Sequence, residues 1–174
     1  MIFHGYGLMV GIAIVVGWSV AEKIEPKVNK AVPGVLLLGF MGARLYHVID
    51  MWGYYNRNLG QILAVWNGGL SIWGAIIGGV LGLWIYFKGD SLKVMAAAVT
   101  GLPLAQAIGR IGNGINGEFV QKVGILPWWG AEAILDLMLF GAMWSLRGQS
   151  SKVRVGVCLV GYALIRLVLQ PYRG

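Results

Sequence analysis

Apolar residues in this chain gather into six long segments that are separated by short polar stretches. Each segment approaches the roughly 20 residues that a helix needs to cross a lipid bilayer, and each is bounded by charged residues, proline or glycine. The segments run over residues 5–21, 32–50, 69–87, 92–109, 128–146 and 153–170. The pattern predicts an all-α fold, a polytopic transmembrane helical bundle of about six spans, in a single integral membrane domain over residues 1–174.

The fourth segment is the least regular of the six, because it holds Thr100, Pro103 and Gln106. Proline removes one backbone donor from a helix, and inside a bilayer the freed carbonyl has no water to bind. We therefore expect a kinked helix whose unpaired backbone groups find partners within the bundle.

The third segment carries glycines at positions 74, 78 and 82. A four-residue spacing places them on one face of a helix, where the missing side chains allow another helix to approach closely. This stripe predicts tight helix packing and implies no chemistry.

The loops predict the orientation of the bundle. Basic residues gather in alternate loops: Lys23, Lys27 and Lys30, then Lys88 and Lys93, then Arg147, Lys152 and Arg154. These are eight of the fourteen Lys and Arg residues. Because basic loops stay in the cytoplasm, we expect both termini to lie on the outer side. The outward loops hold aromatic residues that are typical of an interfacial belt, namely Trp52, Tyr54, Tyr55, Trp66, Trp128 and Trp129.

Composition agrees with a membrane protein. Apolar residues make up 57% of the chain and charged residues 12%, against roughly 25% charged residues in soluble domains. This excludes a soluble globular domain, a disordered tail and a disulfide scaffold. The net charge of +7 fits cytoplasmic loops better than a nucleic-acid surface. The first apolar segment follows Met1 without a basic leader or a clear cleavage site, so we expect it to remain as a span.

Seven ionisable residues fall within or beside apolar segments, where a charge is costly and marks a candidate functional position. They are Arg44, Asp50, Arg110, Glu118, Glu132, Asp136 and Arg166. Glu132 and Asp136 lie at i and i+4 on one helix face. Two carboxylates alone would repel, so we expect an inward-facing arginine to pair with them, in a structural ion pair or in a functional site.

The last segment carries a polar stripe, because Tyr162, Arg166 and Gln170 are spaced at i, i+4 and i+8. An arginine that reaches toward the membrane surface would explain Arg166 alone. The stripe of three favours a cavity-facing role.

The densest polar run covers residues 109–118. Its four glycines in nine residues predict a tightly folded backbone, without a regular helix, at the outer membrane face. Arg110 offers a fork of donors for a phosphate, Asn113 and Asn116 offer amide groups, and Glu118 can orient Arg110 or accept a proton.

Two histidines, His4 and His47, are either structural residues held by hydrogen bonds or candidate proton acceptors. The chain has only one cysteine, Cys158, which excludes an intrachain disulfide and a Cys-rich metal motif. The sequence therefore predicts no metal site and no cofactor.

Taken together, these residues resemble the prolipoprotein diacylglyceryl transferase family, bacterial membrane enzymes that attach lipid to lipoprotein precursors. The run 109–118 is similar to the family signature of Gly-Arg, Gly-Asn, a second Asn and then Glu. Further matches follow the chain order in Tyr6-Gly7-Leu8, Gly42-Ala43-Arg44-Leu45, Trp66-Asn67-Gly68-Gly69-Leu70-Ser71, and Gly161-Tyr162 with Arg166. The family usually has a seventh span after this last motif, whereas the given sequence stops at Gly174. The resemblance therefore implies either a short six-span member of the family or a truncated one.

The chain departs from the family pattern at three positions. Trp73 stands where many members carry a histidine to which the role of base is often given, Gln170 replaces a glutamate, and Gln121 replaces a glycine. The stretch before the fifth segment is also short, which suggests a reduced periplasmic head. An alternative is therefore a degenerate, non-catalytic membrane protein that binds phospholipid or lipoprotein. A small transporter or channel is disfavoured, because the six segments show no inverted repeat.

The resemblance implies transfer of the diacylglyceryl group from phosphatidylglycerol to the thiol of the lipobox cysteine of a prolipoprotein, the first step of lipoprotein maturation. It also implies a multi-pass protein of the bacterial cytoplasmic (inner) membrane. The expected partners are phosphatidylglycerol, lipobox peptides of prolipoproteins and membrane lipid, and no nucleic acid. Such a reaction needs a stabilised phosphate charge and a thiolate.

The resemblance also assigns expected roles. Arg110 and Arg166 would hold the phosphate, and Asn113, Asn116 and Tyr162 would complete the shell of hydrogen bonds. Glu118 would orient an arginine, while Arg44 would bind a second lipid phosphate or pair with Glu132 or Asp136. Gln170 and His47 would contact substrate, and His4, Tyr6 and His47 are the candidates for taking the thiol proton.

Overall fold

The chain folds into two compact helical units. A computed structural model describes residues 3–172, with the side chains of all of these except residues 3–6, 31, 72 and 88. The first unit comprises Met1–Val28 and Leu92–Gly174, and the second comprises Asn29–Ser91. The single membrane domain over residues 1–174 stays a prediction.

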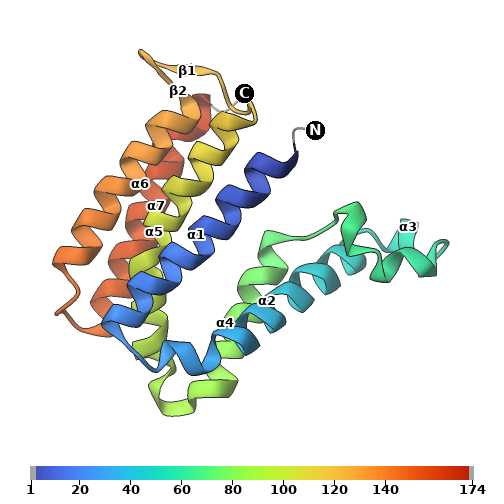
Figure 1. Ribbon diagram of the computed structural model, residues 1–174, viewed down its shortest axis with the longest axis horizontal. Coiled ribbons are helices and arrows are strands. Elements are labelled where there is room, and N and C mark those ends of the chain that lie inside the picture. Colours follow the sequence, from blue (N-terminus) through green and yellow to red (C-terminus); the bar gives the residue numbers. More distant parts are fainter. Residues whose placement is uncertain (1–2, 173–174) are drawn as a thin grey trace. The chain divides into compact units, whose positions relative to one another are not determined.

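The first unit is a bundle of four long helices that lie side by side (Figure 1). They are α1 (Phe3–Ile24), α5 (Ser91–Ile115), α6 (Trp128–Ser145) and α7 (Ser151–Leu169), and a short 3-10 helix, η4 (Gln170–Tyr172), follows α7. The apolar core of this unit lies between α6 and α7, around Trp128, Leu139, Met143, Cys158 and Leu169. The indole Nε1 of Trp128 donates to the Leu169 carbonyl at 2.9 Å. The start of α6 therefore meets the end of α7, and the two helices are antiparallel.

Pro103 lies inside α5 and is fully buried. A proline at this position removes the hydrogen bond that the Val99 carbonyl would accept within the helix. That carbonyl instead accepts from the thiol of Cys158 on α7, with 3.4 Å between sulfur and oxygen. The prediction that the freed backbone group finds a partner inside the bundle is confirmed at this position.

The glycine-rich run at the end of α5 is helical as far as Ile115, so the prediction of a backbone without a regular helix is wrong there. Each glycine costs a helix about 1 kcal/mol relative to alanine, and local packing offsets this cost. Gly112 is buried, and a Cβ on Gly114 would lie 2.5 Å from the indole ring of Trp129. The helix ends at Ile115, and Gly117, with a φ of 70°, turns the chain away from it.

A small antiparallel hairpin connects α5 to α6. Its strands are β1 (Lys122–Val123) and β2 (Leu126–Pro127), in the register Lys122↔Pro127 and Val123↔Leu126. The two-residue turn begins at Gly124, whose φ of 62° suits a tight hairpin. The predicted short connection before the fifth apolar segment is thus a hairpin at the end of the bundle.

The second unit consists of two longer helices joined by short helical turns. Its elements are α2 (Val28–Asp50), α3 (Trp52–Tyr55), η1 (Leu59–Leu63), η2 (Val65–Asn67), α4 (Ile72–Phe87) and η3 (Lys88–Asp90). A Cβ on Gly74 would overlap the Gly42 carbonyl, one on Gly78 would overlap the Leu38 carbonyl, and one on Gly82 would lie 3.1 Å from Val35 Cα. The glycine stripe therefore allows α4 to pack closely on α2, as predicted.

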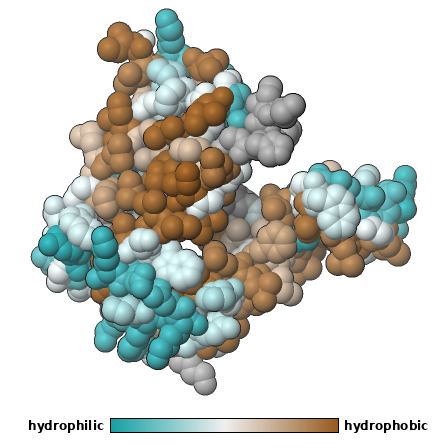
Figure 2. Space-filling view, viewed as in Figure 1, coloured by the Kyte–Doolittle hydropathy of each residue, from teal (hydrophilic) through white to brown (hydrophobic). Residues whose placement is uncertain are grey.

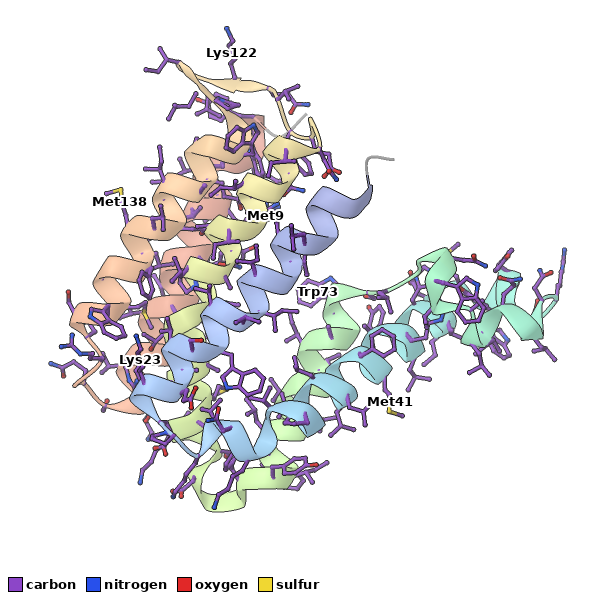
Figure 3. All side chains as sticks on the ribbon, in the orientation of Figure 1. Met9, Lys23, Met41, Trp73, Lys122 and Met138 are labelled. Atoms are coloured by element: carbon purple, nitrogen blue, oxygen red, sulfur yellow. The ribbon has the colours of Figure 1, made fainter. Side chains whose placement is uncertain are left out.

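Six helices occupy the six predicted apolar segments. Within the described residues, α1, α2, α5 and α7 are long and apolar enough to cross a membrane, and α4 is a shorter apolar helix. Figure 2 shows a broad apolar band along the helices of the first unit, with polar residues toward both ends. Lys122 on the hairpin and Lys23 near the end of α1 lie at opposite ends of this unit (Figure 3). These features are those of a multi-pass membrane protein.

Candidate active site

Two arginines from different helices meet at one buried carboxylate in the first unit. Arg110 Nε, near the end of α5, lies 2.7 Å from Glu132 Oε2 on α6. Arg166 Nη1, near the end of α7, lies 3.6 Å from Glu132 Oε1. The Glu132 side chain is fully buried, whereas the Arg110 and Arg166 side chains are 21% and 24% exposed. The predicted pairing of this acid with inward-facing arginines is confirmed for Glu132.

An aromatic ring lies beneath both guanidinium groups. Arg110 Cζ is 5.4 Å, and Arg166 Cζ 5.8 Å, from the ring centroid of Trp128. Trp128 is fully buried, so its predicted place in an interfacial belt is wrong. Its ring attracts both cations through its negative face, and it also packs against Phe119 at 5.2 Å between ring centroids.

A chain of amide groups orients Arg110 from the side. Arg110 Nη1 donates to Asn113 Oδ1 at 2.9 Å, and Asn113 Nδ2 donates to Glu118 Oε2 at 2.7 Å. Asn116 Nδ2 donates to the other oxygen of Glu118 at 3.3 Å. Glu118 therefore reaches Arg110 through Asn113, whereas the carboxylate in direct contact with Arg110 is Glu132.

The polar stripe on α7 is present, with different surroundings for each member. Arg166 Nη2 donates to Gln170 Oε1 at 3.1 Å, and Gln170 is exposed. Tyr162 is half-buried and packs against the apolar core of the unit. Arg166 and Gln170, at the C-terminal end of the stripe, thus form a hydrogen-bonded pair, whereas Tyr162 packs against the core.

Asp136 lies one turn beyond Glu132 on α6 and is fully buried. Neither of its carboxylate oxygens has a hydrogen-bond partner among the described residues. The i and i+4 acids therefore differ in their partners, since Glu132 forms ion pairs with the two arginines and the Asp136 carboxylate accepts no hydrogen bond among the described residues. The sequence marks Glu132 as a candidate functional position that needs a basic partner, but it assigns Glu132 no catalytic or substrate-binding role.

Arg44 and His47 belong to the second unit. The guanidinium of Arg44 donates to four backbone carbonyls: Nε to Ile62 at 2.8 Å, Nη1 to Gly68 at 2.7 Å and Gly69 at 2.8 Å, and Nη2 to Gln61 at 2.6 Å. Its Cζ also lies 5.3 Å from the ring centroid of Tyr55. Arg44 therefore holds the segment between α3 and α4 in place, and a role in binding a lipid phosphate stays a prediction.

His47 lies beside this arginine. Its ring makes an edge contact with Tyr55 at 5.9 Å between centroids. A Cβ on Gly69 would lie 2.7 Å from the imidazole and 2.6 Å from Arg44 Nη1. Gly69 therefore has to be a glycine for both side chains to fit. Tyr55 is buried, so its predicted place in an interfacial belt is wrong as well.

Two predicted candidates for the proton acceptor, His4 and Tyr6, have side chains that lie outside the described residues. Among the residues that are described, no three His, Cys, Asp or Glu side chains gather as a metal site would require. The site that remains is the group of Arg110, Arg166, Glu132 and Trp128, with Asn113 and Glu118 beside it. Two adjacent cations with unused donors are suited to binding an anion.

Comparison with known proteins decides the family. The sequence model of prolipoprotein diacylglyceryl transferase matches residues 1–174. The chain belongs to the prolipoprotein diacylglyceryl transferase family. A relative from Streptococcus uberis, named phosphatidylglycerol–prolipoprotein diacylglyceryl transferase, is 32% identical over 204 aligned positions, which cover 98% of this chain and 79% of the relative.

Other relatives with the same name align with a smaller part of this chain. The protein from Clostridioides difficile is 38% identical over 71% of this chain and 54% of its own length. The protein from Frankia alni is 40% identical over 72% of this chain and 37% of its own length. The chain thus spans about half the length, or less, of these curated relatives.

Proposed function

We propose that this family member transfers the diacylglyceryl group of phosphatidylglycerol to the thiol of a lipobox cysteine in a prolipoprotein. The names of the relatives support this activity, and so does the geometry of the first unit. The observation that carries the proposal is the meeting of Arg110 and Arg166, from α5 and α7, at one buried carboxylate and one indole ring.

Both arginines keep donors for a substrate. Within the described residues, Arg110 Nη2 and Arg166 Nε take part in none of the hydrogen bonds to Asn113, Glu132 or Gln170. Each side chain is about a fifth to a quarter exposed, so an anion can reach it. A guanidinium fork binds phosphate oxygens in pairs, and two forks from separate helices fix the orientation of the phosphate.

The reaction places one demand on these residues. The substrate thiolate attacks the saturated carbon that carries the phosphate, a carbon–sulfur bond forms, and the carbon–oxygen bond to the phosphate breaks. Glycerol phosphate leaves with the bonding electrons, so negative charge grows on the oxygen that the arginines hold. Donors arranged in advance stabilise such charge most effectively in a site away from water.

The thiol must also lose its proton. The positive charge of Arg110 and Arg166 favours the thiolate form of a bound cysteine, which lowers the demand on a base. His4, Tyr6 and His47 are the candidates for accepting the proton, and Tyr162 for a hydrogen bond to the substrate. Asn116, whose Nδ2 donates to Glu118, is a further candidate for the shell of hydrogen bonds around the substrate.

We also propose six spans, with both termini outside the bacterial cytoplasmic (inner) membrane. The alternation of basic loops supports this orientation. It would place the arginine pair and the hairpin near the outer face, where a translocated lipobox peptide and the phosphatidylglycerol of the outer leaflet would meet.

The experiment is a transfer assay with the purified chain. A synthetic lipobox peptide is incubated with the protein in vesicles that contain phosphatidylglycerol, and the peptide mass is measured. The proposal expects the peptide to gain the mass of one diacylglyceryl group, and to gain none in vesicles of phosphatidylcholine alone. Phospholipid that co-purifies with the protein while the peptide mass stays unchanged would instead support the non-catalytic binder.

A further inference from the structure

Phe119, which lies between the end of α5 and the hairpin, has a strained backbone. Its φ of 52° falls in the left-handed region, and it is the only non-glycine residue with a positive φ in the described part of the chain. That region suits glycine and disfavours a bulky side chain. Such strain persists only where neighbouring contacts hold it, and it gathers at functional sites.

Contacts with the start of α6 hold Phe119 in this conformation. The Phe119 carbonyl accepts from the backbone N–H of Trp129 at 3.4 Å, and the Gln121 carbonyl accepts from that of Trp128 at 2.7 Å. The Phe119 ring lies against the Trp128 ring, with 5.2 Å between centroids and 44° between the ring planes. An aromatic pair at this distance attracts beyond the apolar area that it buries. The ring contact therefore offsets part of the strain that the side chain brings.

Phe119 and its neighbour Glu118 reach Arg110 by two different routes. The backbone N–H of Glu118 donates to the Asn113 carbonyl at 2.8 Å, and the Glu118 carboxylate accepts from the Asn113 side chain, which in turn accepts from Arg110. Phe119 reaches the same arginine through Trp128, whose ring lies beneath the guanidinium. The left-handed backbone at Phe119 thus allows two consecutive residues to contact different helices, α5 and α6.

The position of the Trp128 ring affects both cations of the candidate site. Its centroid is 5.4 Å from Arg110 Cζ and 5.8 Å from Arg166 Cζ. The attraction between a cation and a ring requires the cation to stay over the ring face. The Trp128 indole is fixed at Nε1 by the Leu169 carbonyl, and Phe119 supplies a ring contact to it. A shift of the indole would therefore change how the two guanidinium groups are aligned.

We propose that Phe119 is a positioning residue: its ring holds the Trp128 indole beneath Arg110 and Arg166 and thereby aligns the two guanidinium groups toward the substrate phosphate. Phe119 acts through Trp128. The inference rests on the proposed function, because it concerns the same arginine pair. It also explains why a bulky residue stands at a position whose backbone suits glycine.

The first arm of the test follows Trp128 without any transfer. The purified full chain carries isotope-labelled tryptophan, and the indole N–H signal of Trp128 is identified in NMR spectra as the one that Trp128→Phe lacks. Glycine adopts a φ of 52° without strain, so Phe119→Gly removes the ring and keeps the fold. We expect the Trp128 indole N–H to exchange with deuterium about tenfold faster in this variant. Val120→Ala, an exposed neighbour, is the matched control and should leave the exchange unchanged.

The second arm measures transfer to a lipobox peptide in phosphatidylglycerol vesicles. We expect kcat of Phe119→Gly to fall about tenfold, while KM for phosphatidylglycerol changes less than about twofold. Two cations still attract the phosphate, but they no longer meet the growing charge in alignment. Phe119→Tyr keeps the ring and should restore most of the rate, and Val120→Ala should keep all of it. A merely structural role would lower the amount of folded protein and leave kcat per folded molecule unchanged, and that result would overturn the proposal.

Failure of this inference is distinct from failure of the proposed function. If the unchanged protein transfers no lipid, the proposed function fails, and the indole exchange then decides whether Phe119 holds Trp128. Equal exchange of the Trp128 indole N–H in Phe119→Gly and in the unchanged protein would overturn the inference at any rate of transfer.

Discussion

Arg44, Arg110 and Arg166 each lie over an aromatic ring, but their hydrogen-bond and ion-pair acceptors differ. Arg44 satisfies four carbonyls beside Tyr55, whereas Arg110 and Arg166 share Glu132 beside Trp128. The sequence indicates that an arginine in an apolar segment needs partners. It does not indicate which ones, because these pairs join residues that are 17 to 34 positions apart and depend on how the helices pack.

Glu132→Gln tests the centre of the candidate site. The amide keeps the shape and removes the charge that pairs with Arg110 and Arg166, so we expect the free energy of unfolding to fall by about 1.5–3 kcal/mol. Denaturant unfolding followed by circular dichroism measures this. Glu118→Gln is the matched control, because Glu118 is exposed and reaches Arg110 only through Asn113. An equal loss in both variants contradicts the central place of Glu132.

Arg44→Lys tests the clamp in the second unit. A lysine has three donors at one point and cannot reach four carbonyls in a fork, so at least one hydrogen bond of about 1 kcal/mol is lost. We expect amide hydrogen exchange in residues 59–69 to become about tenfold faster, while exchange in α4 is unchanged. Exposed Arg57→Lys serves as the control, and unchanged exchange in Arg44→Lys would show that the clamp does not hold this segment.

At the level of elements, the sequence predicts the positions of the six long helices. It does not predict that the polar run 109–118 is helical as far as Ile115. All six apolar segments are helices, because their length and hydropathy leave the backbone no other way to satisfy its hydrogen bonds in lipid. The glycines of this run predict an irregular backbone, but the burial of Gly112 and the close packing of Gly114 on Trp129 outweigh the low helix propensity of glycine. Such contacts lie between segments and leave no mark on the local pattern.

The packing of α4 on α2 gives a prediction with an internal control. Gly74→Ala places a methyl group against the backbone of Gly42, so we expect the protein to lose about 1–3 kcal/mol of stability. Gly79 on the same helix has open space where its Cβ would lie, so Gly79→Ala should be neutral or gain up to about 1 kcal/mol. Thermal unfolding of both variants measures the difference, and equal stability contradicts the close approach of the two helices.

At the level of the whole molecule, the sequence predicts a membrane protein of the transferase family, and four helices meet the length and hydropathy of a span. The alternation of basic loops adds an orientation that the fold alone does not contain. The hairpin and the loop between α6 and α7 lie at opposite ends of the first unit (Figure 1). They should therefore lie on opposite sides of the membrane.

Cysteine labelling tests this orientation. We expect Lys122→Cys, on the hairpin, to react with a membrane-impermeant maleimide in intact cells stripped of their wall. Gly148→Cys, between α6 and α7, should react only after lysis. The native Cys158 is buried and should add little background. The reverse pattern of labelling would contradict the proposed outward position of the termini.

The central claim is that Arg110 and Arg166 hold the phosphate during diacylglyceryl transfer, and one measurement tests it most directly. The rate of transfer to a lipobox peptide is compared in phosphatidylglycerol vesicles for Arg110→Ala, Arg166→Ala and the exposed control Arg147→Ala. Because donors to a developing negative charge contribute about a hundredfold or more to a rate, we predict at least that loss in the first two variants. The control should keep the rate of the unchanged protein. Transfer at the unchanged rate in Arg110→Ala or in Arg166→Ala, with the protein folded, would contradict the account.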